Sequence, residues 1–145
     1  MTVKPLWTEL VIPVRTYDID FSGVVSNLAA VRWLEDLRLT MGVAHCPLER
    51  MLEAGIAPTV VKTEISYMSP VHLGDTVVGS MWVGMSGTAR WTVEARITVN
   101  GRIAVTGRQT LCFSKISTGR VVRIPSWMRE KYESDLCPGL TVLEA

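Results

Sequence analysis

The sequence predicts an α+β domain in which an antiparallel sheet is wrapped around one long helix. Residues 28–41 are apolar with a period near 3.6, and from residue 58 onward the period changes to 2. Asn100-Gly101 lies between two alternating segments and is a strong signal for a type I′ hairpin turn. One apolar helix followed by a run of antiparallel strands favours two packed layers, because the helix can bury its apolar face only against the sheet.

The N-terminal part of the chain predicts a strand, a turn and the start of the helix. Residues 10–17 form the expected first strand, in which Pro13 indicates an edge position or a bulge because it donates no hydrogen bond. Residues 21–23 predict a turn. Either Ser26 or Asn27 can then cap the long helix with a side-chain oxygen.

The long helix contains so many apolar residues that we expect it to be buried on most sides. Its predicted inner face consists of Ala30, Leu34, Leu37 and Met41, with Trp33 alongside. Gly42 can end this helix, since glycine adopts the left-handed conformation common at helix C-termini. Residues 47–54 predict a shorter helix that Gly55 closes.

Alternating patterns predict the strands that follow. In residues 58–67, one face holds Val61, Thr63, Ile65 and Tyr67, and the other holds Lys62, Glu64 and Ser66. Residues 90–99 alternate more regularly, with an apolar face of Trp91, Val93, Ala95, Ile97 and Val99. The hairpin turn pairs this strand with residues 102–113, and another strand at residues 76–85 precedes the pair.

The C-terminal part predicts a turn at residues 117–119 and a short helix at residues 125–132. No pattern assigns residues 134–145 to an element. Together the elements predict one domain, residues 1–145, with a core over about residues 8–128.

Composition and charge exclude several classes of function. A net charge of +1 gives no electrostatic reason to expect a nucleic acid or an anionic membrane as partner. No apolar run approaches the roughly 18 residues that a membrane helix needs, and the N-terminus lacks the apolar region of a secretory signal. The three cysteines are widely spaced without a C-x-x-C motif, so we expect free thiols and a cytoplasmic protein.

The most promising arrangement for chemistry lies just before the long helix. Asp20 precedes Gly23 by three residues and the predicted helix start at Ser26 by six. A helix N-terminus presents unpaired N–H groups and the positive end of the helix dipole. A carboxylate beside such donors can attack, or direct water to, a carbonyl group whose oxygen the donors polarise.

An ordered series of motifs extends from this arrangement along the chain. It begins with Tyr17-Asp18-x-Asp20-x-x-Gly23-Val24-Val25 and Trp33-Leu34-Glu35-x-x-Arg38. It continues with the strand ending at Tyr67, Pro70-x-x-x-Gly74-Asp75, Asn100-Gly101-Arg102-x-Ala104-x-x-Gly107, and Gly119-Arg120 with Ile124-Pro125. This series, over about residues 8–128, resembles the 4-hydroxybenzoyl-CoA thioesterase-like branch of the hotdog-fold acyl-CoA thioesterases.

The resemblance implies a hotdog fold and hydrolysis of an acyl thioester of coenzyme A or of an acyl-carrier protein, with no cofactor and no metal. It assigns Asp20 as the nucleophile or as the base for water, and the backbone N–H of Asn27, beside Ser26, as the oxyanion donor. Gly23 would allow close approach of the chain, and Asp18 is expected to be a structural turn carboxylate. The predicted sheet has more apolar surface than one helix can cover, and its edge strand needs a partner, so we expect a homodimer or a tetramer built from dimers. The resemblance adds that the sites lie at the dimer interface, with residues from both chains.

Coenzyme A carries phosphates, so basic residues are candidates for binding it. These candidates are Arg90, Arg120 and Arg123, with Lys62 behind them, although each also fits a solvated surface charge. Two positions depart from commoner family patterns: Val24 stands where many relatives have His or another polar residue, and Ala30 where they have an aromatic residue. Ala30 would widen the acyl end of the pocket or pack against a second subunit.

Two alternatives stay open at this point. A hotdog dehydratase or hydratase needs a positioned histidine, and we expect neither His45 nor His72 near the Asp20 loop. A non-catalytic acyl-binding protein would retain an unpaired carboxylate beside its acyl tunnel at a desolvation cost. A metal site and a serine triad have no support, because neither histidine has metal-ligand spacing and no G-x-S-x-G frame surrounds Ser26, Ser66 or Ser69.

Overall fold

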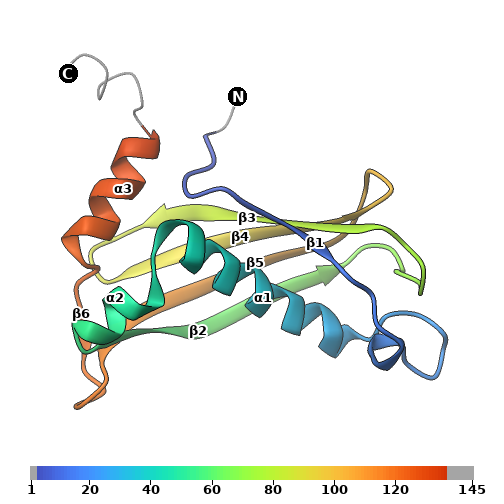
Figure 1. The fold of residues 1–145 in the computed structure, drawn as a ribbon, viewed down its shortest axis with the longest axis horizontal. Helices are drawn as coiled ribbons and strands as arrows, with labels where there is room; N and C mark the ends of the chain where they lie inside the picture. The colour runs from blue at the N-terminus through green and yellow to red at the C-terminus, as the bar shows by residue number, and fades with distance from the viewer. Residues whose placement is uncertain (1–2, 137–145) are drawn as a thin grey trace.

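The computed structural model describes residues 3–136 of the chain. A six-stranded antiparallel sheet forms one layer, and helix α1 lies across one of its faces (Figure 1). The elements follow the chain as β1 (Thr8–Ile12), η1 (Thr16–Asp18), α1 (Asn27–His45), α2 (Leu48–Glu53), β2 (Ile56–Tyr67), β3 (Val77–Ser86), β4 (Arg90–Val99), β5 (Arg102–Lys115), β6 (Val121–Val122) and α3 (Ser126–Leu136). This sheet around a long helix is the predicted α+β hotdog fold.

The strands lie in the order β1-β3-β4-β5-β2, and the short β6 pairs with β5. β2 forms one edge of the sheet and, among the described strands, pairs with β5 alone. The core lies between α1 and the sheet, and its fully buried side chains include Leu34, Leu37, Met81 and Phe113. The free side of β2 is therefore available to another strand.

The predicted strand at residues 90–99 is confirmed residue for residue as β4, including its buried face. Its turn into β5 is the predicted two-residue hairpin, since Asn100 and Gly101 have φ angles of 51° and 82°. The pairing of Val99 with both Val77 and Arg102 then places the start of β5 at the same end of the sheet as the end of β1. The turn before α1 begins at this end.

The first strand is shorter than predicted. β1 ends at Ile12, before Pro13, which cannot donate a hydrogen bond to the sheet. Residues 16–18 form a single 3₁₀ turn instead of strand. The Asp18 carboxylate accepts a hydrogen bond from the backbone N–H of Arg15 at 2.8 Å, and this local bond stabilises the turn against the extended conformation.

Helix α1 corrects two expectations. It continues past Gly42 to His45, and the N–H of Cys46 donates to the Gly42 carbonyl at 2.9 Å before Pro47 follows. It is also buried on one face rather than on most sides. The opposite face holds four exposed apolar side chains, here called the α1 stripe: Leu28, Val31, Leu39 and Val43. In the single chain this stripe has no apolar layer over it among the described residues.

Strand β2 contains a bulge that the alternation does not reveal. Its register with β5 shifts between Val60 and Lys62. Val61, which we placed on the same face as Ile65, is 46% exposed, whereas Val60 packs against the core. Beyond the bulge, Ile65 also packs against the core.

The boundaries of the other elements differ from the predicted ones by a few residues. β3 begins one residue later than predicted, β5 extends to Lys115, and the two-residue β6 was not predicted. The short helix before Gly55 is confirmed. α3 extends to Leu136, so residues 134–136 of the unassigned tail are helical, and residues 137–145 lie outside the described part of the chain. In the described part, no helix has the length and apolar character needed to cross a membrane.

Candidate active site

Asp20 lies in a tight turn between η1 and α1, at the end of the sheet away from α2 and α3 (Figure 1). Its Oδ1 atom accepts hydrogen bonds from the Ser22 hydroxyl at 2.6 Å and from the Ser22 backbone N–H at 2.8 Å. These bonds, the hydroxyl's first, hold the pKa of Asp20 below its ordinary value of 3.8. The carboxylate is therefore ionised at neutral pH, and its Oδ2 atom has no hydrogen-bond partner within residues 3–136.

Gly23 completes this turn. Its N–H donates to the Asp20 carbonyl at 3.0 Å, and the Asp20 N–H donates to the Val24 carbonyl at 2.9 Å. The φ angle of Gly23 is +85°, a conformation that side chains strongly disfavour, whereas a Cβ atom there would meet nothing within 4 Å. In the single chain the glycine is thus required by the backbone conformation of the turn rather than by close approach of another segment.

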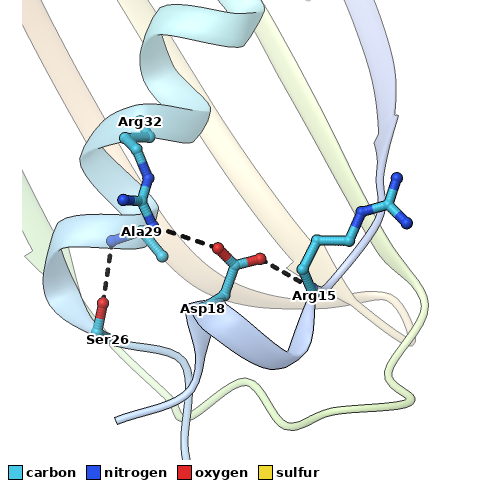
Figure 2. A network of polar contacts seen from close by, with 5 residues as sticks. All are labelled: Arg15, Asp18, Ser26, Ala29 and Arg32. Atoms are coloured by element: carbon cyan, nitrogen blue, oxygen red, sulfur yellow. Dashed lines mark hydrogen bonds and ion pairs between the residues drawn. The ribbon is translucent and has the colours of Figure 1, made fainter.

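Asp18 anchors the turn to α1 (Figure 2). It is buried, and besides the bond from Arg15 its Oδ1 atom lies 3.3 Å from Nη2 of Arg32 on α1. Its backbone carbonyl also accepts the N–H of Ser26 at 2.8 Å. These contacts agree with the structural role expected for Asp18, because both carboxylate oxygens are occupied.

The start of α1 offers two unpaired N–H groups. The Ser26 hydroxyl caps the helix by accepting the N–H of Ala29 at 3.1 Å. The Ser26 N–H is already bonded to Asp18, so Ser26 serves the cap rather than an oxyanion. The N–H groups of Asn27 and Leu28 have no acceptor in the described part of the chain. At the positive end of a 19-residue helix, they can stabilise a developing oxyanion.

A cavity of about 260 Å³ lies beside this helix start, between α1, the end of β2 and the loop at residues 68–71. Val24 and Ala30, the two departures from common family patterns, both line it. The Tyr67 hydroxyl donates to the Asn27 carbonyl at 3.1 Å and so ties β2 to the helix start. Asp20 stands on the adjoining turn and does not itself line the cavity in the single chain.

Arg102 contacts the lining of this cavity, which we did not predict. Its guanidinium contacts the Ser69 hydroxyl and donates to the Pro70 carbonyl at 3.2 Å, and both of these residues line the cavity. The signal in the sequence is its position directly after the Asn100-Gly101 turn, which returns the chain to the Asp20 end of the sheet.

The expectation that neither histidine lies near the Asp20 loop is wrong for His72. The Val25 N–H donates to the Val71 carbonyl at 2.8 Å, so the loop that carries His72 packs beside the turn. The His72 ring lies near Asp75, with Nδ1 and Oδ2 3.8 Å apart. Within residues 3–136, no three His, Cys, Asp or Glu side chains gather as metal ligands would.

A single chain does not bring the four basic candidates to the Asp20 turn. Arg90 begins β4, and a rise of about 3.3 Å per residue sets it roughly 30 Å from the strand end near the turn. Arg120 and Arg123 flank β6 at that same far end (Figure 1). Lys62 lies within β2, where its Nζ atom is 3.6 Å from Oε1 of Glu64. All four side chains are exposed.

The chain is similar to known proteins in sequence and in fold. The sequence profile of a family described as the thioesterase-like superfamily matches residues 14–132. No curated protein sequence matches the chain. Among solved structures, a thioesterase from Thermus thermophilus, complexed with coenzyme A and Zn, is 24% identical, with a TM-score of 0.77 over 91% of this chain and 95% of that chain.

Two structures from Staphylococcus aureus are also similar. The DHNA-CoA thioesterase is 21% identical, with a TM-score of 0.79 over 93% of this chain and 94% of that chain. The SAV2348 protein, in complex with CoA, is 14% identical, with a TM-score of 0.81 over 93% of this chain and 85% of that chain. At these identities the likeness establishes the shared fold.

Proposed function

Since the chain belongs to the thioesterase-like superfamily and is a thioester hydrolase, we propose that it cleaves acyl thioesters of coenzyme A, or of an acyl-carrier protein, with Asp20. One observation carries the proposal: an ionised carboxylate with a free oxygen stands on the turn before a helix start that has two unpaired N–H groups. The solved CoA complexes of the same fold support coenzyme A as the carrier.

In the proposed reaction, the thioester carbonyl oxygen approaches the N–H groups of Asn27 and Leu28, which stabilise its developing charge. In one route the Asp20 carboxylate attacks the carbonyl carbon, the CoA thiolate leaves, and water cleaves the mixed anhydride. In the other route Asp20 takes a proton from an attacking water. Both routes consume one water and release a carboxylic acid and the CoA thiol.

We propose a homodimer, or a dimer of dimers, as the working form. The free edge of β2 and the exposed α1 stripe both support this, since long bare edges and apolar faces are normally covered. A twofold pairing through the two β2 edges would set the α1 helices antiparallel. The end of one copy that holds Arg90, Arg120 and Arg123 would then lie toward the Asp20 end of the other. This arrangement would give the basic residues the route to CoA phosphates that a single chain lacks.

We also propose that the chain acts as one domain in the cytoplasm. Cys46 and Cys112 are buried free thiols, which suit a reducing compartment. Burial raises the pKa of Cys46 to about 11, so this thiol stays protonated and unreactive at neutral pH.

The test of the function is a panel of aryl, short-chain and long-chain CoA thioesters, with acyl-carrier-protein thioesters beside them, assayed by release of free thiol. We expect turnover of at least one CoA thioester. Binding of these compounds without any thiol release would instead support the non-catalytic acyl-binding alternative.

A hydratase or dehydratase is the second candidate, because the His72 loop packs beside the Asp20 turn. His72→Gln separates the two candidates, since the amide cannot transfer protons as imidazole does. A thioesterase should keep its thiol release in this variant and should not hydrate an enoyl-CoA. Hydration that His72→Gln abolishes would support the second candidate.

A further inference from the structure

A second cavity of about 370 Å³ lies along the C-terminal half of α1, between α1, α2, β2 and the inner face of β4 and β5. Its lining is mainly apolar and includes Leu39, Val43, Met51, Val60, Leu111 and Phe113. At 1.5 Å per residue, Gly42 in its wall lies roughly 22 Å along the helix from Asn27. The cavity is therefore remote from the Asp20 turn of its own chain, and in the proposed dimer it lies toward the Asp20 turn of the second copy.

A partly buried polar network holds Arg38 in the wall of this cavity. The Arg38 Nη1 atom donates to Oε1 of Gln109 at 2.5 Å, and Nε2 of Gln109 donates to the Thr63 hydroxyl at 3.1 Å. Gln109 is 3% exposed and lies on the inner face of β5, so it has no freedom to turn away. Burial lowers the pKa of Arg38, and Glu35 opposes that effect. The bond to Gln109 uses one of the five guanidinium N–H donors, and Nη2 lies 4.0 Å from Oε1 of Glu35. The guanidinium therefore keeps N–H donors that no hydrogen bond occupies within residues 3–136.

Trp91 supplies a second donor to the same wall. It lines the cavity and lies diagonally across from Gln109, because Trp91 pairs with Leu111 and Val93 pairs with Gln109. Its indole N–H is buried and has no hydrogen-bond partner within residues 3–136. Native proteins rarely leave a buried donor unpaired, so this N–H calls for an acceptor that the described part of the chain does not supply. Arg38 and Trp91 thus both offer hydrogen-bond donors at the wall of this cavity.

From this donor pair we propose that the cavity receives the acyl group of the substrate and selects acyl groups that carry an uncharged oxygen, a ketone or a hydroxyl, on their chain. The inference rests on the proposed thioesterase function and adds the class of acyl group. A pure hydrocarbon chain would fill the apolar lining but would leave both donors without an acceptor, which is costly once the bound chain excludes water from them.

The charges of the cavity lining favour an uncharged oxygen over a carboxylate on the acyl chain. Glu35 and Glu49 also line the cavity, whereas Arg38 is its one basic lining residue among those described. Cys46, also in the lining, stays protonated at neutral pH. An acyl chain ending in a carboxylate would therefore meet two negative charges against one positive charge. A hydroxyl or ketone oxygen accepts from Arg38 or Trp91 without that repulsion.

The test compares the binding of non-hydrolysable S-(2-oxoalkyl)-CoA thioethers of equal chain length by titration calorimetry. One analogue has a plain chain, others have a hydroxyl or ketone moved along it, and one ends in a carboxylate. The 2-oxo carbonyl is common to all, so any difference comes from the chain oxygen. We expect one oxygenated analogue to bind at least roughly tenfold more tightly than the plain and carboxylate analogues, as one charge-assisted hydrogen bond would produce.

Two variants test whether Arg38 and Trp91 cause that preference. Arg38→Met and Trp91→Phe each remove a donor while retaining most of the side-chain volume, and each should reduce the preference without weakening the plain analogue. Arg108→Met is the matched control: Arg108 lies on the same sheet, is paired with Glu94 and does not line this cavity, so its replacement should leave the preference intact. Trp91→Phe also keeps the edge-to-face packing on Phe113, so the test does not depend on Arg38→Met folding.

The outcomes separate this inference from the proposed function. Equal binding of all analogues by a wild-type protein that hydrolyses CoA thioesters would overturn the inference and leave the function standing. A preference for the oxygenated chain in a protein that releases no thiol from any substrate would overturn the function and keep the cavity assignment. A preference that survives both donor variants would also overturn the inference, because another group would then recognise the oxygen.

Discussion

At the scale of single residues, the segment before α1 contains two carboxylates with different surroundings. Asp18 is buried and has both oxygens occupied by Arg15 and Arg32, whereas Asp20 has one oxygen without a partner in the described part of the chain. The same type of side chain thus stabilises the loop at position 18 and is available for chemistry at position 20.

Asp18→Asn should destabilise the protein by about 1–3 kcal/mol, because a buried charge-assisted hydrogen bond is lost. Any loss of activity should follow the loss of folded protein. Urea unfolding alongside kcat at a temperature where the variant is folded checks this. Unchanged stability together with abolished kcat would contradict the structural role of Asp18.

Ser22→Ala should shift the acid limb of the kcat/KM pH profile upward. The Ser22 hydroxyl is the first cause of the lowered Asp20 pKa, so its removal moves that pKa back toward 3.8. Activity depends on the ionised form and is lost as the pH falls through the pKa, so the variant loses activity at a higher pH than the wild type. An acid limb at the same pH in both proteins would argue that another group controls it.

At the scale of elements, α1 and β2 are the parts that the single chain leaves incomplete. The α1 stripe exposes 85% of Val43 and 55% of Leu39, and β2 has a bare edge among the described strands. Leu39→Glu together with Val43→Glu should reduce the oligomeric state, because two charges would be buried in the contact between copies. Light scattering measures the mass, with the exposed Leu73→Glu, outside the α1 stripe, as a control. A wild-type protein that is monomeric at micromolar concentration and fully active would contradict the proposed assembly.

The elements that the sequence predicts well are those with local causes. The alternation of β4 and the Asn100-Gly101 turn both act over a few residues, and both are confirmed. The shortened β1 has local causes that the alternation does not reveal, namely Pro13 and the bond from Arg15 to Asp18. The Val61 bulge depends on a non-local partner, because β5 sets the register of β2, and periodicity contains no information on that partner.

At the scale of the whole molecule, the candidate site also has a part that the sequence predicts and a part that depends on the folded topology. The sequence predicts that Asp20, Gly23, Ser26 and Asn27 lie together, because they are neighbours in the chain. It did not locate Arg102 or the His72 loop, which the sheet topology brings to the same end. The role of the basic residues stays a prediction, because in one chain Arg90, Arg120 and Arg123 lie at the far end of the sheet and Lys62 lies within β2.

Replacing Arg90, Arg120 and Arg123 together by Ala should raise KM for CoA thioesters several-fold with little change in kcat. These residues would bind the remote phosphates equally in the ground and transition states. A truncated N-acetylcysteamine thioester, which lacks the phosphates, should show an unchanged KM in the same variant. An unchanged KM for the CoA thioester in a folded protein would remove the proposed phosphate role.

The most direct test of the account is kcat of Asp20→Asn with the best thioester of the panel. Asparagine keeps the shape and the Ser22 hydrogen bonds of the turn but is neither a nucleophile nor a useful base at neutral pH. The account predicts a loss on the order of 10² to 10⁴ in kcat, with folding and binding of the substrate largely unchanged. Residual turnover would come from the N–H groups of Asn27 and Leu28, which the substitution leaves in place. A wild-type kcat in Asp20→Asn would contradict the assignment of the chemistry to this turn.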